Sequence, residues 1–226
     1  MKIKKRFRIA IITVIAAISL FAAAFYIYTL DYYRADAYAM QTINEEAELV
    51  ENADGITVFH PEEGTDKGIA LIFYPGGKVE AESYAPLLRR ISREGITCVL
   101  VRMPFNLAVF DVNAADRVYE ILPEIKNWYI GGHSLGGAMA SSYAGKNKER
   151  IKGVVLLGAY PVGSVDVPAL TVYGSEDKVL DRTKLEGVKN IVEIAGGNHA
   201  YFGNYGEQDG DGTASIARED QQLQTA

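Results

Sequence analysis

The stretch "YIGGHSLGGAMA", residues 129–140, contains a serine with glycines two residues before and two residues after it, Gly132-His133-Ser134-Leu135-Gly136. The segment before Ser134 is typical of a strand, and the segment after it is typical of a helix. A sharp strand-to-helix turn would project Ser134 outward, and a side chain in place of either glycine would collide with the neighbouring elements. This context predicts a nucleophilic serine. The alternative is a glycine-rich structural turn without chemistry.

Short apolar segments alternate with helical segments along most of the chain. The candidate strands lie within residues 56–60, 68–77, 96–101, 128–132, 153–158, 169–174 and 191–195, and the candidate helices between and after them are 80–94, 112–121, 135–145 and 214–222. This alternation predicts an α/β domain with a mainly parallel central sheet of about seven strands and helices on both faces. Ligands of such sheets bind at the carboxyl ends of the strands.

The first thirty residues differ in composition from the rest of the chain. Five basic residues lie among the first eight, and the 22 residues from Ile9 to Leu30 carry no charge. A helix of that length reaches about 33 Å, enough to cross the hydrocarbon core of a bilayer. The sequence therefore predicts that residues 1–30 form a cytoplasmic basic segment and a transmembrane signal-anchor. The rest of the chain is then expected on the extracytoplasmic side of the cell membrane.

A cleaved signal peptide is the alternative interpretation of this segment. Ala22 and Ala24 offer a small-residue cleavage site after a short apolar core, and cleavage there would release a secreted protein. The apolar run continues past that site to Leu30, which favours an uncleaved anchor. Under either interpretation the chain after this segment is exported. Within that part of the chain, residues 31–54 are predicted as a connecting helix and residues 55–226 as the globular domain.

The charge balance of the remainder limits its partners. The chain has 23 Lys and Arg residues and 29 Asp and Glu residues; without the five basic residues at the start, 18 stand against 29, a net charge of −11. Such a surface argues against nucleic-acid binding. The single cysteine, Cys98, cannot form an internal disulfide, and its apolar surroundings predict a buried thiol.

The serine motif in its strand–helix context resembles the α/β-hydrolase superfamily, in particular its small bacterial, serine esterase-like members. The resemblance covers about residues 55–226 and implies an α/β-hydrolase fold with a triad in the chain order serine, acid, histidine. Larger lipases of this fold often carry a lid after the strand that follows the serine, but here only "GAYPVGSVDVP" separates two strands. We therefore expect a minimal or absent lid and an open, shallow site for small or exposed acyl groups.

Three histidines compete for the role of catalytic base. His60 precedes the serine and ends an early strand, which favours a surface or structural role. His133 occupies the variable position beside Ser134, and its side chain is expected to point away from the serine. His199 follows the last strand, in a glycine-rich loop at the carboxyl end of the predicted sheet. His199 is therefore the predicted base.

The resemblance also implies the position of the acid. In the family the acid follows a strand–Gly–x–x–Asp pattern, which "LTVYGSED" places on Asp177. This carboxylate would fix the tautomer of His199 and stabilise its protonated form. The neighbouring Glu176 and Asp181 are interpreted as members of a solvated acidic loop, and Asp166 is a weaker alternative.

Two backbone N–H groups form the predicted oxyanion hole. The amide of Leu135 begins the helix after the serine, so its N–H and the helix dipole face any negative charge formed there. The second donor is expected in the loop Pro75–Lys78, at the position of the family's His-Gly-Gly loop, although a Tyr-Pro pair replaces the usual apolar–His pair. Gly77 is the predicted donor and Lys78 the alternative.

These residues together predict a serine hydrolase that cleaves a small-molecule carboxylic ester through an acyl-enzyme, without a metal or organic cofactor. Acyl transfer and hydrolysis of an amide or peptide are alternatives on the same triad. A non-catalytic binding domain is a third alternative, although such a domain needs no triad. The acidic stretch "GEQDGDG", residues 206–212, lacks the full spacing of a calcium loop and is predicted to cover the site near His199. The sequence predicts no particular oligomeric state.

Overall fold

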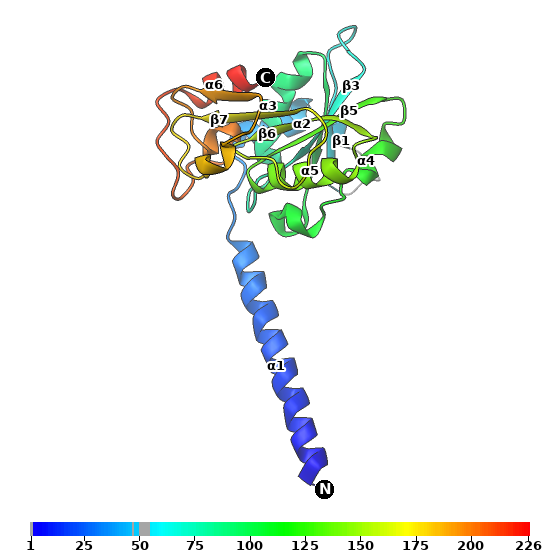
Figure 1. Ribbon diagram of the computed structural model, residues 1–226, viewed down its shortest axis with the longest axis vertical. Helices are drawn as coiled ribbons and strands as arrows, with labels where there is room; N and C mark the ends of the chain where they lie inside the picture. Colours follow the sequence, from blue (N-terminus) through cyan, green and yellow to red (C-terminus); the bar gives the residue numbers. More distant parts are fainter. Residues whose placement is uncertain (1, 47, 50–54) are drawn as a thin grey trace. The chain divides into compact units, whose positions relative to one another are not determined.

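The computed structural model of the protein describes residues 2–46, 48–49 and 55–226. The chain divides into two compact units, Met1–Tyr32 and Tyr33–Ala226, each of which is described by itself (Figure 1). The first unit contains helix α1 (Lys2–Leu30). Its residues Arg6–Leu30 reach a mean hydropathy of 2.5. Their length and composition suit a membrane span or a signal sequence.

The second unit is built on a sheet with the strand order β1-β2-β4-β3-β5-β6-β7-β8. The strands are β1 (Glu48–Leu49), β2 (Ile56–Phe59), β3 (Ile69–Tyr74), β4 (Thr97–Val101), β5 (Asn127–His133), β6 (Ile151–Leu157), β7 (Ala169–Gly174) and β8 (Ile191–Ile194). β2 pairs antiparallel with β1 and β4, and all other neighbouring strands are parallel. The predicted mainly parallel sheet of about seven strands is confirmed, and the additional strand is the two-residue β1 at the edge.

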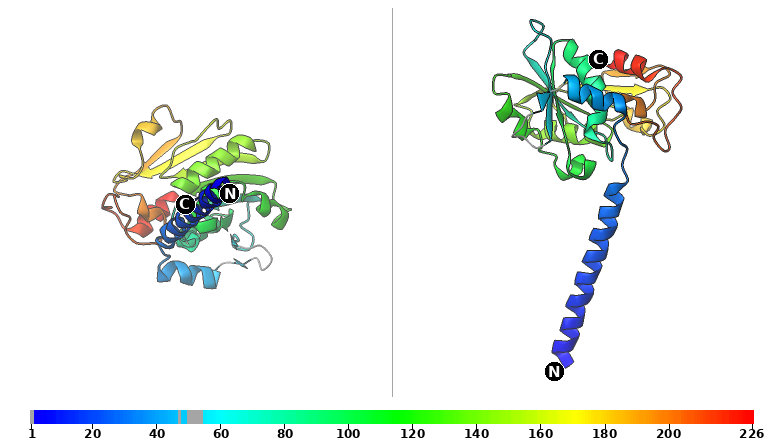
Figure 2. Two further views of the ribbon diagram at one scale, coloured as in Figure 1. Left: turned by 90° about the horizontal axis from the view of Figure 1, so that it is seen from below. Right: turned by 180° about the vertical axis from the view of Figure 1, so that it is seen from behind.

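Helices cover both faces of this sheet, as predicted (Figures 1 and 2). On one face lie α4 (Asp116–Ile121) and α5 (Leu135–Lys146), and on the other lie α2 (Ala37–Glu46), α3 (Ala85–Arg93) and α6 (Arg218–Thr225). Both α2 and α6 pack against α3. Short 3₁₀ helices occupy the connections: η1 (Ala81–Tyr84), η2 (Pro104–Asn106), η3 (Ala108–Phe110), η4 (Arg182–Leu185) and η5 (Ala200–Phe202).

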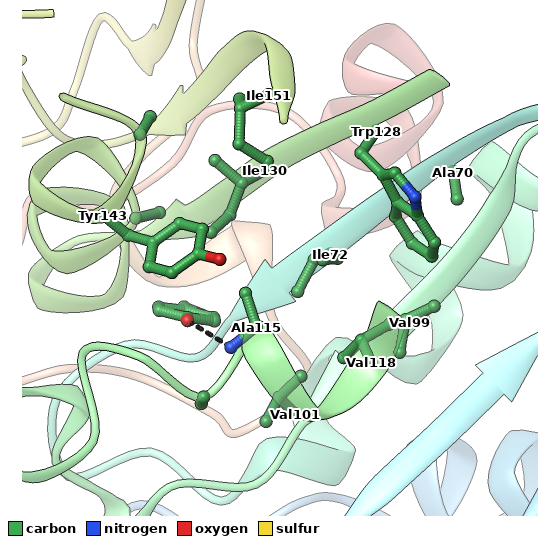
Figure 3. Close-up of a cluster of buried hydrophobic side chains, with 14 of the residues drawn as sticks. Ala70, Ile72, Val99, Val101, Ala115, Val118, Trp128, Ile130, Tyr143 and Ile151 are labelled. Carbon is green, nitrogen blue, oxygen red and sulfur yellow. Dashed lines mark hydrogen bonds between the residues drawn. The ribbon is translucent and has the colours of Figure 1, made fainter. Parts of the chain in front are cut away.

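The central strand β3 shows why this sheet needs apolar residues at every position. Ala70 and Ile72 pack on the side of α4 and α5 (Figure 3), whereas Leu71 and Phe73 pack on the side of α3. Consecutive side chains of a strand point to opposite faces, so a strand covered on both faces is apolar throughout. The continuous apolar run at residues 69–74 indicates this central position.

A buried tyrosine determines where α4 begins. Tyr74, the last residue of β3, accepts a hydrogen bond from the N–H of Ala115 at 2.8 Å and donates one to the carbonyl of Val112 at 3.0 Å. Figure 3 draws the bond to Ala115 as a dashed line. Because these bonds satisfy backbone groups of the preceding turn, the helix begins at Asp116 rather than at the predicted residue 112.

Helix α2 lies within the second compact unit, which begins at Tyr33. The sequence predicts instead a connecting helix over residues 31–54 and a domain that begins at residue 55. The difference arises because α2 packs against α3 and η1, and its Ile43 is buried in the core on the α3 side of the sheet. The predicted end of the connecting helix near Asn52 lies outside the described residues.

Candidate active site

Ser134 lies at a sharp turn between β5 and α5, as its flanking sequence predicts. Its φ of +52° is in the left-handed region, which costs a non-glycine residue about 1–3 kcal/mol. The two flanking glycines allow a close approach of backbone. A Cβ on Gly132 would lie 2.6 Å from the carbonyl oxygen of Tyr74, and a Cβ on Gly136 would lie 2.2 Å from the carbonyl oxygens of Tyr74 and Pro75. Packing against the end of β3 therefore requires both glycines.

Asp177 and His199 form a buried pair at the carboxyl ends of β7 and β8. Nδ1 of His199 lies 2.8 Å from Oδ2 of Asp177, and the side chains are at most 1% exposed. The other carboxylate oxygen, Oδ1, accepts hydrogen bonds from the N–H groups of Val179 and Leu180 at 2.9 and 2.8 Å. Both oxygens of Asp177 are therefore engaged, and the carboxylate has a fixed orientation.

The second nitrogen of His199 is the one available for chemistry. Nε2 is buried and makes no hydrogen bond within the described part of the chain. His199 and Ser134 line one open cleft of about 310 Å³, whose wall also includes Leu135, Tyr160 and Val179. Asp177 does not line this cleft and contacts it through the histidine. The structure thus brings the predicted serine and histidine to one cleft and the predicted acid to the histidine.

The backbone of the loop after β3 distinguishes between the two predicted oxyanion donors. The N–H of Gly76 donates to the hydroxyl of Tyr84 at 3.0 Å, and the N–H of Lys78 donates to the carbonyl of Asn106 at 2.8 Å. Among the described residues, the N–H of Gly77 has no such partner. Gly77 also lies against Leu135, whose Cδ2 would be 2.9 Å from a Cβ on this glycine. This geometry favours Gly77 over Lys78 as the second donor.

The other acidic side chains of the sequence analysis lie apart from His199. Asp181 accepts hydrogen bonds from the backbone N–H and the hydroxyl of Thr183, and these bonds lower the pKa of its exposed carboxyl. Asp166 is exposed and accepts a bond from the Ser164 hydroxyl. Glu176 accepts one from Ser175. Among the acids considered, the described contacts join Asp177 alone to the histidine.

Comparisons with known proteins establish the family. The sequence profile described as "Alpha/beta hydrolase family" matches residues 70–223, which is more than half of the chain. The chain belongs to the alpha/beta hydrolase family. A search of curated proteins finds no significant match.

Solved structures share the fold of this hydrolase at low sequence identity. An alpha-beta serine hydrolase homologue from Coxiella burnetii is 17% identical, with a TM-score of 0.52 over 69% of this chain and 89% of that one. A serine hydrolase without a lid from Xanthomonas campestris is 14% identical, with a TM-score of 0.54 over 69% and 86%. Est1E from Butyrivibrio proteoclasticus, bound to ferulic acid, is 14% identical, with a TM-score of 0.53 over 67% and 91%. These similarities confirm the predicted α/β-hydrolase fold.

The acidic stretch at residues 206–212 supports the histidine loop of the hydrolase. Oδ2 of Asp211 accepts a hydrogen bond from the N–H of Ala200 at 2.9 Å, directly after His199. Oδ1 of Asp211 accepts one from the N–H of Gly212 at 2.7 Å. Within the described residues no group of three or more His, Cys, Asp or Glu side chains could hold a metal ion. Through the bond between Asp211 and Ala200, the stretch fixes the backbone directly after His199.

The sequence analysis considers His133 only as the neighbour of Ser134 and does not predict that its buried ring lies beside the candidate base. The rings of His133 and His199 have centroids 4.4 Å apart. Nδ1 of His133 lies 2.7 Å from the hydroxyl of Tyr84, and that hydroxyl already accepts a bond from Gly76. Burial raises the pKa of Tyr84, so its hydroxyl stays protonated and forms a neutral hydrogen bond with Nδ1 of His133. A polar residue at the end of a buried strand could have indicated this network.

The buried His133 is expected to make the protein less stable below about pH 6.5. Burial first, and the nearby His199 second, lower the pKa of His133 well below its usual value of 6.5, while a contact with the His199 backbone opposes them. The unfolded chain binds this proton at a higher pH than the folded chain, so protons favour unfolding. As the pH falls from about 6.5 toward 5, we expect this group to remove up to about 1.4 kcal/mol of unfolding free energy per pH unit.

Urea unfolding of wild type and His133→Asn at several pH values in this range measures the effect. The variant should lose part of the pH dependence, whereas His60→Gln, which changes an exposed histidine, should retain all of it. Equal slopes for wild type and His133→Asn would show that His133 titrates normally in the folded protein.

Proposed function

We propose that this chain is a serine hydrolase that cleaves a carboxylic ester through an acyl-enzyme, with Ser134, His199 and Asp177 as its triad. The observation that carries the proposal is the buried Asp177–His199 pair, whose histidine lines one cleft with a strained serine. A structural glycine turn needs neither the histidine nor the acid. A binding domain equally has no use for a carboxylate that fixes one imidazole tautomer.

The proposed reaction begins when Oγ of Ser134 attacks the ester carbonyl carbon and Nε2 of His199 takes the serine proton. The carbonyl electrons move onto oxygen, which accepts hydrogen bonds from the N–H groups of Leu135 and Gly77. Each such donor contributes about 3 kcal/mol to the transition state. The intermediate collapses, the bond to the alcohol oxygen breaks, and His199 returns the proton to that oxygen. Water activated by His199 then releases the acid from Ser134. These steps call for no metal or organic cofactor.

The cleft supports a substrate whose ester group is readily accessible. Its volume of about 310 Å³ is at the lower end of small-molecule sites. Eleven residues, 158–168, join β6 to β7, so this connection adds no lid over the serine. Est1E, with its bound ferulic acid, shows that the fold can hold a small carboxylic acid. We therefore propose an ester of a small or exposed acyl group as the substrate.

We also propose that α1 is an uncleaved signal-anchor with its basic end in the cytoplasm and the hydrolase unit on the extracytoplasmic side. The helix of Arg6–Leu30 has the length and hydropathy of a single span. Cleavage after Ala24 would instead give a secreted enzyme. Fractionation and intact mass separate the two, because an anchored chain stays full-length in the membrane fraction, whereas cleavage removes the first 24 residues and releases the rest.

Labelling with a fluorophosphonate tests the proposed activity. We expect one adduct on the full chain in detergent, read as intact mass, and none on Ser134→Ala, because alanine removes the attacking oxygen. Ser164→Ala, which changes an exposed serine, is the matched control and should be labelled like wild type. Thermal melting confirms that each variant is folded. A folded wild type that forms no adduct, or an adduct that persists on Ser134→Ala, would contradict the proposal.

A further inference from the structure

The loop between β4 and α4 exposes a cluster of large apolar side chains. Phe105 is 50% exposed, Phe110 is 52% exposed and Val109 is 46% exposed. The two phenylalanine rings pack edge to face, with centroids 5.7 Å apart. Exposed apolar side chains that cluster mark interaction surfaces more often than isolated ones do. We call residues 103–111 the aromatic loop.

The backbone of the aromatic loop is in a strained conformation. Phe105 and Asn106 have φ angles of +55° and +54°, a region that costs an ordinary residue about 1–2 kcal/mol. The loop is nevertheless fixed, because the carbonyl of Asn106 accepts the N–H of Lys78 and Leu107 is buried close to Gly77. The strained backbone and the partly exposed phenylalanine rings both lower the stability of the folded protein. A loop that is kept in this conformation points to a role in binding.

The aromatic loop adjoins the candidate active site. η3 contacts α5, the helix that follows Ser134, and the side chains of Leu107 and Leu135 both lie against Gly77. The cleft itself is also apolar at its wall, where Val179 is 39% exposed. A surface that binds the aromatic loop therefore lies close to the mouth of the cleft.

The chain enters the compact unit beside the same loop. The N–H of Tyr33 donates to the carbonyl of Lys78 at 2.8 Å, and the N–H of Glu80 donates to the carbonyl of Tyr33 at 2.9 Å. Two residues, 31 and 32, separate Tyr33 from the last residue of α1. Even a fully extended chain spans at most about 11 Å over that distance. If α1 crosses the membrane, covalent length alone limits how far Tyr33 can lie from the bilayer surface.

We propose that the aromatic loop docks on the lipid bilayer and that the hydrolase takes its ester from an amphiphile held in that bilayer. This inference rests on the proposed hydrolase activity and on the proposed anchor. Phenylalanine side chains partition favourably into the boundary between headgroups and acyl chains. The shallow cleft fits this source, because the acyl chain of the amphiphile can remain in the bilayer while its ester carbonyl reaches Ser134.

Turnover of vesicle-borne and soluble esters tests the proposal with the full chain reconstituted in phosphatidylcholine vesicles. The variant Phe105→Asn/Phe110→Ser removes both rings, and asparagine suits the positive φ at residue 105. We expect about tenfold slower hydrolysis of a long-chain p-nitrophenyl ester dissolved in the vesicles. Hydrolysis of soluble p-nitrophenyl acetate should stay within about twofold. Leu223→Ser, at a 64% exposed position of α6, is the control and should change neither rate. Equal effects on both esters, or none, would overturn the proposal.

Fluorescence quenching separates this inference from the proposed activity. In vesicles that contain brominated lipids, Phe105→Trp should be quenched at least twofold more strongly than Leu223→Trp, because bromine quenches tryptophan only at short range. Equal quenching at the two positions would overturn docking whatever the enzyme's activity. A protein that is quenched at residue 105 but never labelled by fluorophosphonate would instead overturn the hydrolase and leave the docking surface standing.

Discussion

Replacing His199 with glutamine is expected to lower kcat/KM for a soluble ester by about four to six orders of magnitude. His199 has one nitrogen bound to Asp177 and the other without a partner among the described residues. Glutamine cannot take the serine proton near neutral pH, so Oγ of Ser134 would attack as a weak neutral nucleophile. The effect should appear mainly in kcat, because the cleft wall that binds the substrate is otherwise retained.

Steady-state kinetics with p-nitrophenyl acetate measure this loss, and His60→Gln supplies the matched control. His60 is exposed and follows β2, so its replacement should leave kcat/KM within about twofold of wild type. A His199→Gln variant that retains more than about a tenth of the activity would show that another group acts as the base. The buried His133 would then be the next residue to replace.

The local parts of the fold follow from the sequence, because local sequence patterns determine them. The turn at Ser134 depends on Gly132 and Gly136, which lie within two residues of it, and the continuous apolar run of β3 indicates a buried central strand. Two features could not be predicted in the same way. β1 is two residues long and has no pattern of its own. The position of α2 depends on Ile43 packing on a helix more than forty residues later in the chain.

The same distinction between local and distant contacts applies to the candidate site. The order of serine, acid and histidine along the chain predicts Asp177 and His199, which the structure brings to 2.8 Å. The choice between Gly77 and Lys78 depends on a carbonyl at Asn106, which lies far along the chain at the end of the short helix η2. The bond between Tyr84 and His133 joins a 3₁₀ helix to the end of a distant strand. Neither contact leaves a periodic pattern in the sequence.

Replacing Asp177 with asparagine is expected to lower kcat by about 10⁴-fold with little change in KM. The reason lies in how the carboxylate is held. Oδ1 accepts two backbone N–H groups, so the amide oxygen of asparagine should take that position and its NH₂ group should face Nδ1 of His199. A donor at that point stabilises the tautomer with the proton on Nε2. In that tautomer Nε2 has no lone pair with which to accept the proton of Ser134.

Asp166→Asn is the matched control for this prediction, since Asp166 is exposed and its described contacts are with Lys148 and Ser164 rather than with the histidine. It should leave kcat unchanged, and thermal melting should show that both variants are folded. A loss at Asp166→Asn comparable to that at Asp177→Asn would move the acid to the connection after β6. A full rate in Asp177→Asn would mean that the tautomer of His199 is not fixed by its partner, and the triad would reduce to a serine and a histidine. The backbone donors at residues 179 and 180 make the predicted outcome specific, because they determine which end of the asparagine amide the imidazole meets.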